Sequence, residues 1–183
     1  MAPQTRHYRA TARLLHWGMA ILLIGLIIAG FIMVQNGLPQ ALQNQLFAMH
    51  KNIGLLVLVL VLLRLAYRMV NPAPPLPASI SPVQRRIAAV SHASLYLLMI
   101  AMPVLGYVRV RAGGFPVESL DAWGVPALIA KSEPLAAAAK SAHYAGALLL
   151  TALVVLHVGA ALYHALVLRD GVFARMATGG ARR

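Results

Sequence analysis

Four long apolar segments alternate with more polar connections along the chain. They cover approximately residues 14–34, 50–69, 90–108 and 146–168. Each is close to the roughly 20 residues that a helix needs to cross the core of a bilayer. The first segment is too long for a signal peptide, and His16 and Trp17 interrupt it. The pattern predicts an all-α fold, in which residues 1–183 form a single membrane domain built as a four-helix bundle.

The connections between these segments differ in character. Residues 35–49 are uncharged, and residues 71–77 form a proline-rich spacer that cannot continue a helix. Ser81 and Pro82 then predict the start of the third helix. The longest connection, residues 109–141, contains Trp123 and a short apolar run over residues 125–130. That run is too short to span a bilayer, so we expect it to lie in the outer membrane interface.

Composition agrees with a membrane protein. The chain is 60% hydrophobic and 11% charged, with a mean hydropathy of +0.74. Its net charge of +12 would suit a nucleic-acid-binding protein, but the distribution of the cations excludes that class. Eleven of the sixteen basic residues fall on the side of the termini: Arg6, Arg9, Arg13, Arg64, Arg68, Arg85, Arg86, Arg169, Arg175, Arg182 and Arg183. The positive-inside rule therefore predicts that both termini are cytoplasmic.

The spacing of the histidines carries the most chemical information. His143, which we expect to open the last helix, and His157 lie fourteen residues apart, which places them about 40° apart on one helix face and roughly 21 Å apart along its axis. His50 opens the second segment, and His16 lies near the start of the first. Because consecutive helices run in opposite directions, His50 matches His143 in depth on the outer side. His16 matches His157 on the inner side.

Two such pairs are typical of metal centres in a bundle core. Bis-histidine ligation gives a b-type haem suited to electron transfer, with no coordination position left for a substrate. The chain has no cysteine, which excludes thiolate ligands and the attachment sequence of c-type haems. Two other interpretations are open: histidines that line a polar cavity or hydrogen-bond between helices, and a zinc site, although zinc favours clustered ligands.

Two further residues share the inward face of these helices. Arg64 follows His50 by fourteen residues, so it could neutralise the propionates of an inner haem or extend to the cytoplasmic headgroups. His164 follows His157 by seven residues and could donate a proton to a quinone or face the headgroups. His92, at the start of the third helix, is equally ambiguous.

The sequence resembles the bacterial cytochrome b561 family, especially its small inner-membrane branch described as superoxide oxidase. The resemblance covers about residues 10–176 and rests on these matches: Leu14-Leu-His-Trp17, Met49-His50, Val61-Leu-Leu-Arg64, Asn71-Pro-Ala-Pro-Pro75, Ser91-His-Ala-Ser-Leu-Tyr96, Met102-Pro-Val-Leu-Gly106, His143, His157 and His164. It implies a four-helix bundle in the bacterial inner membrane. It also implies two b haems held by His16, His50, His143 and His157.

The same resemblance implies a superoxide:ubiquinone oxidoreductase that oxidises superoxide to oxygen on the periplasmic face. Five basic residues of the outer side could attract the superoxide anion, or bind lipid phosphates instead: Lys51, Arg109, Arg111, Lys131 and Lys140. One alternative is a haem subunit that passes electrons for a separate protein donor, such as a hydrogenase, a dehydrogenase or a periplasmic carrier. Another is a bundle that transports metal ions or protons without haem.

Overall fold

The computed structural model describes residues 7–177, and all of the regular structure in that range is helical. The helices are α1 (Ala10–Ile32), α2 (Gln40–Val70), α3 (Pro82–Ala112), α4 (Glu118–Ala122), α5 (Glu133–Tyr163), the π-helical turn η1 (His164–Leu168) and α6 (Ala174–Ala177). Four helical segments of the described chain are long and apolar enough to cross a membrane: α1, α2, α3, and α5 continued through η1. The predicted all-α membrane fold is confirmed.

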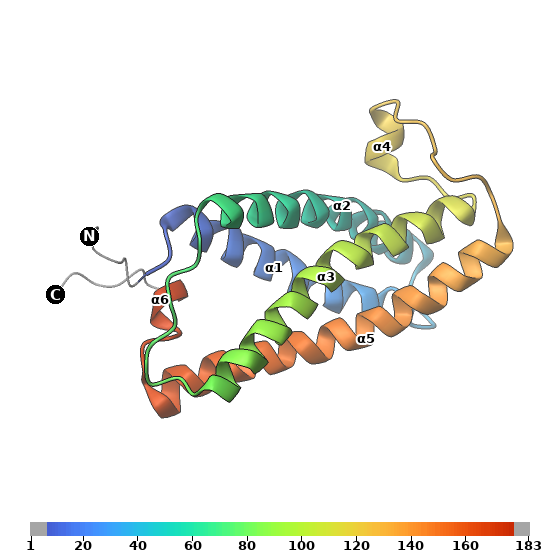
Figure 1. Ribbon diagram of the computed structural model, residues 1–183. Helices are drawn as coiled ribbons and strands as arrows, with labels where there is room; N and C mark the ends of the chain where they lie inside the picture. The colour runs from blue at the N-terminus through green and yellow to red at the C-terminus, as the bar shows by residue number, and fades with distance from the viewer. Residues whose placement is uncertain (1–6, 178–183) are drawn as a thin grey trace.

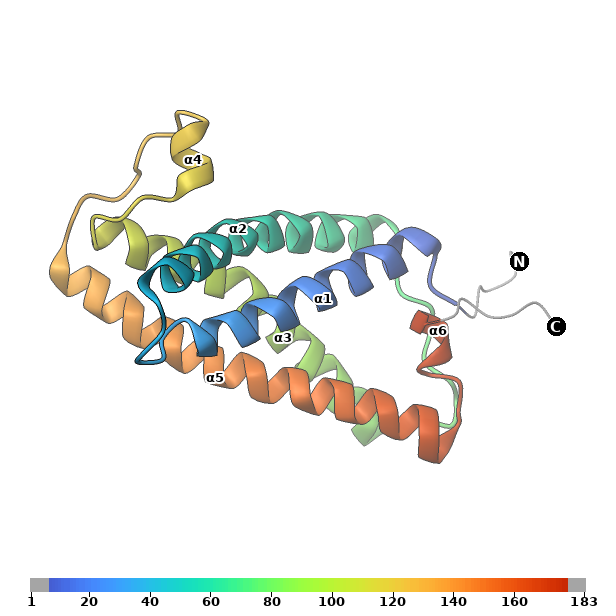
Figure 2. The ribbon, with the colours of Figure 1, turned by 180° about the vertical axis from the view of Figure 1, so that it is seen from behind.

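The long helices run side by side in alternating directions (Figures 1 and 2). Both ends of the described chain and α6 lie at one end of the bundle, and α4 lies at the other. Close backbone packing joins α3 to α5, α1 to α2 and α2 to α3. In contrast, α5 stands apart from both α1 and α2, so side chains rather than backbones meet across that part of the bundle.

The helices extend beyond the predicted apolar segments. α2 begins at Gln40 rather than at residue 50, and α5 begins at Glu133 rather than at residue 146. Hydropathy detects only the part of a helix that lies in hydrocarbon, whereas polar residues such as glutamine continue the same helix into the headgroups. His50 and His143 therefore lie well inside their helices, and the expectation that they open them is wrong.

The start of α3 follows the predicted signal. The Ser81 hydroxyl accepts a hydrogen bond from the Gln84 N–H (3.3 Å), and the Gln84 side chain accepts one from the Ser81 N–H (3.0 Å). This reciprocal cap satisfies two backbone donors that the first turn leaves free, and Pro82 needs no donor there. The proline-rich spacer before it has no regular structure.

The predicted interfacial segment is only partly regular. α4 is a single short helix that ends just before Trp123, and the apolar run over residues 125–130 is not helical. Trp123 and Leu128 are 76% and 78% exposed, so their apolar side chains are available to a membrane interface.

Candidate cofactor sites

His50 of α2 and His143 of α5 face each other across the bundle, at the end that carries α4. Their ring centres are 6.3 Å apart, and the ring planes are inclined by 70°. The Nδ1 of His143 lies 3.1 Å from the carbonyl oxygen of Met102. Since a carbonyl only accepts hydrogen bonds, this nitrogen carries the proton and Nε2 keeps its lone pair. The Nδ1 of His50 is buried and forms no hydrogen bond of normal length and angle with the described residues.

Glycines from the neighbouring helices support both rings. A Cβ added at Gly30 of α1 would lie 3.2 Å from Cε1 of His50, and one added at Gly106 of α3 would lie 3.4 Å from Cε1 of His143. A side chain at either position would press on the imidazole. Sequence reasoning missed this role, because nothing in the local sequence connects Gly30 with a ring on another helix.

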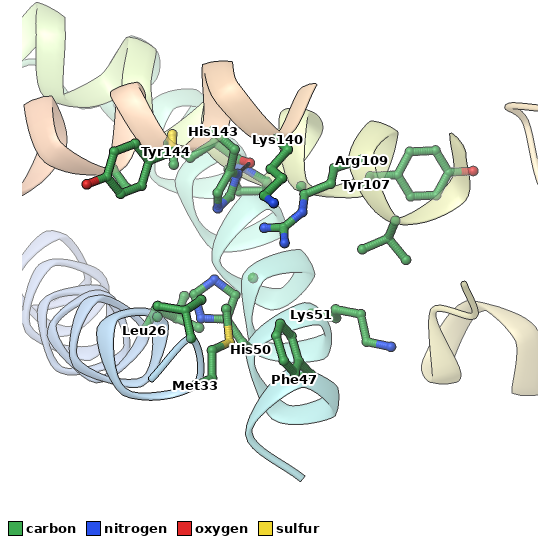
Figure 3. Close-up of a pocket in the computed structure, with 18 of the residues that line it drawn as sticks. Leu26, Met33, Phe47, His50, Lys51, Tyr107, Arg109, Lys140, His143 and Tyr144 are labelled. Carbon is green, nitrogen blue, oxygen red and sulfur yellow. Dashed lines mark hydrogen bonds between the residues drawn. The ribbon is translucent and has the colours of Figure 1, made fainter. Parts of the chain in front are cut away.

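A cavity of about 970 Å³ surrounds this histidine pair. Its walls are mainly apolar and come from all four long helices, from residues 115–117 of the loop before α4 and from Glu118 at the start of α4. Figure 3 shows His143, Lys140 and Arg109 on one side of the cavity, with His50 opposite. The charged ends of Arg109 and Lys140 lie beside the two rings, on the side of His143 (Figure 3). A planar apolar ligand with acidic groups would meet complementary surfaces here.

The five predicted outer cations divide into different environments. Lys51 points away from the histidines (Figure 3) and lies 2.5 Å from a carboxylate oxygen of Glu118. Arg111 is buried and forms an ion pair with Asp121. The charges of these two cations are thus compensated by α4. Lys131 is exposed, and its alkyl chain packs near Gly114.

Arg109 and Lys140 have no carboxylate partner among the described residues. Arg109 is partly buried, and Lys140 is exposed at the edge of the cavity. Of the five outer cations, these two bring uncompensated positive charge to the cavity.

Both carboxylates of α4 are held in their charged form. Burial raises the pKa of Glu118, but hydrogen bonds from Lys51 and Asn52 outweigh this effect, and the pKa falls below its ordinary value. The hydrogen bond from the Arg111 guanidinium lowers the pKa of Asp121. The N–H of Ser119 also donates to the Asn52 side chain at 3.0 Å. These contacts fasten α4 to α2 and α3.

The second predicted pair lies toward the other end of the bundle. The ring centres of His16 on α1 and His157 on α5 are 6.1 Å apart, with an interplanar angle of 69°. The ring of His92 on α3 lies 5.4 Å from that of His157, so this site contains a third imidazole. His92 is exposed, but its ring lies beside the inner pair.

Arg64 also points into the bundle at this depth. Its Nη1 donates to the carbonyl of Ala12, one helical turn before His16, at 2.6 Å. Its Nε donates to the Tyr96 hydroxyl at 3.0 Å. The side chain therefore links α1, α2 and α3 close to the inner histidines instead of extending to the headgroups.

His164 lies in η1, beyond His157, and its ring is edge-on to that of Tyr163. Its Nδ1 is 2.6 Å from a carboxylate oxygen of Asp170. Burial raises the pKa of Asp170, but the hydrogen bonds with His164 and the Val172 N–H outweigh it, so the pKa is lowered. Sequence reasoning missed Asp170, because six residues on a regular helix would place it on another face.

Both cross-bundle pairs have the separation that a shared metal ion requires. Bonds of about 2 Å from one ion to two imidazole nitrogens would separate the ring centres by roughly 6 Å. The observed values are 6.1 and 6.3 Å. Between residues 7 and 177, no three or more His, Cys, Asp or Glu side chains converge closely enough to hold one metal ion by themselves, the three inner imidazoles included. The residues present fit a macrocyclic metal cofactor with two axial imidazoles.

The sequence matches the family described as prokaryotic cytochrome b561 over residues 7–179. The chain belongs to this family. Cytochrome b561 proteins are membrane electron-transfer oxidoreductases that carry b-type haem, so the chain is a multi-pass membrane cytochrome. The histidine pairs described above are its candidate haem ligands.

Three curated proteins are similar to this cytochrome b561 chain over most of its length. "Cytochrome b561 homolog 2" of Escherichia coli (strain K12) is 32% identical over 170 residues, covering 92% of this chain and 90% of the relative. "Probable superoxide oxidase CybB" of Yersinia pestis is 30% identical over 164 residues, covering 88% and 90%. "Cytochrome b561 homolog 1" of Escherichia coli (strain K12) is 30% identical over 131 residues, covering 69% and 72%.

Proposed function

We propose that this cytochrome b561 oxidises superoxide to oxygen at the end of the bundle that carries α4, and reduces ubiquinone at the end that carries the termini. The proposed orientation places α4 in the periplasm and both termini in the cytoplasm of a bacterium, following the positive-inside rule. The observation that carries the proposal is the presence of two cross-bundle histidine pairs, His50–His143 and His16–His157, at two depths of one membrane bundle. A single haem would lie near only one face of the membrane, whereas two haems would carry electrons from one face to the other.

The four histidines would hold two b haems, which would supply one-electron carriers. The Nδ1–H of His143 donates to the Met102 carbonyl, which orients the ring and leaves the lone pair of Nε2 free to bind a metal. Gly30 and Gly106 leave room for the rings of His50 and His143, because a Cβ at either position would meet the imidazole. With two histidines at each site, the protein itself would supply the ligands and superoxide would only exchange an electron.

Oxidation of superoxide requires removal of one electron and no proton transfer to the substrate. The protein therefore needs only to bring the anion close. Arg109 and Lys140 supply uncompensated positive charge at the cavity beside the outer pair, and such a field raises the encounter rate of a small anion. The 30% identity to a relative named as a probable superoxide oxidase favours this substrate.

Reduction of ubiquinone consumes two electrons, from two superoxide anions, together with two protons. His164 lies beyond the inner pair, toward the termini, and an imidazole can donate a proton near neutral pH. We therefore assign it the role of proton donor to ubiquinone. Arg64 beside the inner pair could compensate the acidic groups of a haem there.

Purified protein tests the proposal directly. We expect two b haems per chain in a reduced-minus-oxidised spectrum and a pyridine haemochrome assay. Superoxide added with ubiquinone should then reduce the haems and form one quinol for every two superoxide anions. Haem without superoxide-driven quinol formation would support the alternative of an electron-transfer subunit for a protein donor. Protein without haem would overturn both the oxidoreductase and the electron-transfer subunit, and would support a bundle that transports metal ions or protons.

A further inference from the structure

Asp170 pairs with a histidine in a region rich in arginine. It is the single acidic residue after Glu133, and the end of the bundle where it lies carries most of the arginines. Within the described residues, the ion-pair partner of its carboxylate is His164, with 2.6 Å between Nδ1 and Oδ2. The two side chains are only 17% and 13% exposed. If Asp170 only balanced the positive charge of this end, we would expect it to form an ion pair with one of the arginines instead of with a histidine.

The backbone departs from regular geometry to bring these residues together. On an α-helix, residues six apart lie about 120° apart around the axis, so their side chains diverge. Here the helix opens into the π turn η1, and Arg169 then adopts a left-handed conformation, with φ 48° and ψ 36°. The N–H of Val172 donates to the second oxygen of Asp170 at 3.1 Å and fixes the carboxylate.

This π turn and left-handed residue are both features that concentrate at functional sites. The ring of Tyr163 is edge-on to that of His164 at 6.2 Å, and the Nε of Arg169 donates to the Leu166 carbonyl. The Asp170 carboxylate is placed to accept a hydrogen bond from the Nδ1–H of His164.

A carboxylate at Nδ1 orients an imidazole. It fixes the tautomer and the ring orientation, so that Nε2 is the nitrogen available to another molecule. His164 would then give a proton from Nε2 while its Nδ1–H continues to donate to Asp170.

We propose that Asp170 is the positioning residue of a proton-transfer couple with His164, and that this couple protonates a reduced quinone at the end of the bundle that carries the termini. The inference rests on the proposed function, because it takes the quinone as the proton acceptor. Each reduction forms two O–H bonds on the quinone with two electrons derived from two superoxide anions. His164 supplies its Nε2 proton for each of the two O–H bonds and takes a proton from water after each transfer, so that both protons of the quinol come from water through His164.

Three variants test the couple: Asp170→Asn, Asp170→Glu and the matched control Glu133→Gln. Glu133 is also acidic and exposed, but it forms no ion pair within the described chain. Asp170→Asn should slow quinol formation by about 10- to 100-fold, as for other groups that orient a histidine. Reduction of the haems by superoxide without quinone should stay unchanged. Asp170→Glu should restore most of the rate, and Glu133→Gln should match the wild type.

The division of the effect between kcat and KM separates a positioning role from a structural one. Loss of the carboxylate leaves His164 in place but without its orienting partner, so Asp170→Asn should lower kcat for quinol formation and leave KM for ubiquinone nearly unchanged. Asp170→Glu keeps a carboxylate and should restore most of kcat. An unchanged kcat in Asp170→Asn, or equal damage by both substitutions, would overturn the inference.

The remaining outcomes separate this inference from the proposed function. If His164→Gln forms quinol at the wild-type rate while Asp170→Asn does not, the couple is wrong but the oxidoreductase stands. If wild-type protein forms no quinol from superoxide, the proposed function itself fails. If Asp170→Asn does not fold, Asp170→Glu and His164→Gln still test the couple: Asp170→Glu should form quinol at most of the wild-type rate and His164→Gln should not, and a wild-type rate in His164→Gln would overturn the couple.

Discussion

His143 and His50 belong to helices that do not pack closely, yet their ring centres lie 6.3 Å apart. A Cβ at Gly30 of α1 or at Gly106 of α3 would meet one of these rings, and His143 also donates to a backbone carbonyl. The ring separation recurs nearer the termini with His16 and His157, at 6.1 Å. The outer pair is therefore enclosed by α1 and α3 as well as by the helices that carry it.

Replacement of one ligand should remove one haem and leave the other. We expect His143→Ala to lower the haem content from two to one per chain, because the two pairs share no residue. His157→Ala should do the same for the other haem. A pyridine haemochrome assay with protein quantification measures the ratio, and redox titration identifies which potential disappears. Loss of both haems in His143→Ala with an intact fold by circular dichroism would contradict separate pairing.

Gly30→Ala should selectively weaken the outer site. The new methyl group would lie 3.2 Å from Cε1 of His50 and force the ring to shift, so we expect outer haem to be lost more easily on dilution or mild heating. Gly25→Ala, on the same helix, is the matched control, because its methyl group would have no atom within 4 Å. Equal haem retention in the two variants would show that Gly30 does not support the ring.

Charge at the outer cavity should control the superoxide reaction. Arg109→Gln and Lys140→Gln remove uncompensated charges, so each should slow haem reduction by superoxide several-fold and reduce its dependence on salt. Stopped-flow absorbance at several ionic strengths measures both effects. Arg86→Gln, an exposed change at the other end, serves as the control. A rate that salt does not alter in wild-type protein would argue against electrostatic attraction.

The ion pairs that hold α4 against α2 and α3 should weaken in acid. The pKa of Asp121 is lowered by its ion pair with Arg111, so the pair contributes full stability above the ordinary pKa, about pH 4, and loses it as pH falls further. Glu118, whose pKa is also lowered, acts in the same direction. Limited proteolysis near Gly124 should be faster at about pH 3 than at neutral pH, with an acid-active protease.

Asp121→Asn should reproduce that loosening at neutral pH, because it removes the charge of the pair. We expect faster cleavage in residues 113–132 and no change in haem content. Glu133→Gln, which breaks no ion pair in the described chain, should be cleaved at the wild-type rate. Identical cleavage of Asp121→Asn and wild type would show that this ion pair does not hold the loop.

The sequence by itself determined the membrane class, the number of long helices and the four candidate haem ligands. Apolar segments of spanning length dictate helices, because a bilayer leaves no other partner for backbone polar groups. The fourteen-residue interval between His143 and His157 then fixes two depths on one helix face. The pairing with His50 and His16 followed from the alternation of helix direction alone.

Tertiary structure decided everything that depends on contacts between distant segments. It extended α2 and α5 beyond their apolar parts, and it separated Lys51 and Arg111, paired with α4, from Arg109 and Lys140. It also brought Asp170 back to His164 through a π turn. Hydropathy and spacing describe one helix at a time, whereas ion pairs and ring supports arise from how helices pack and where their regular geometry breaks.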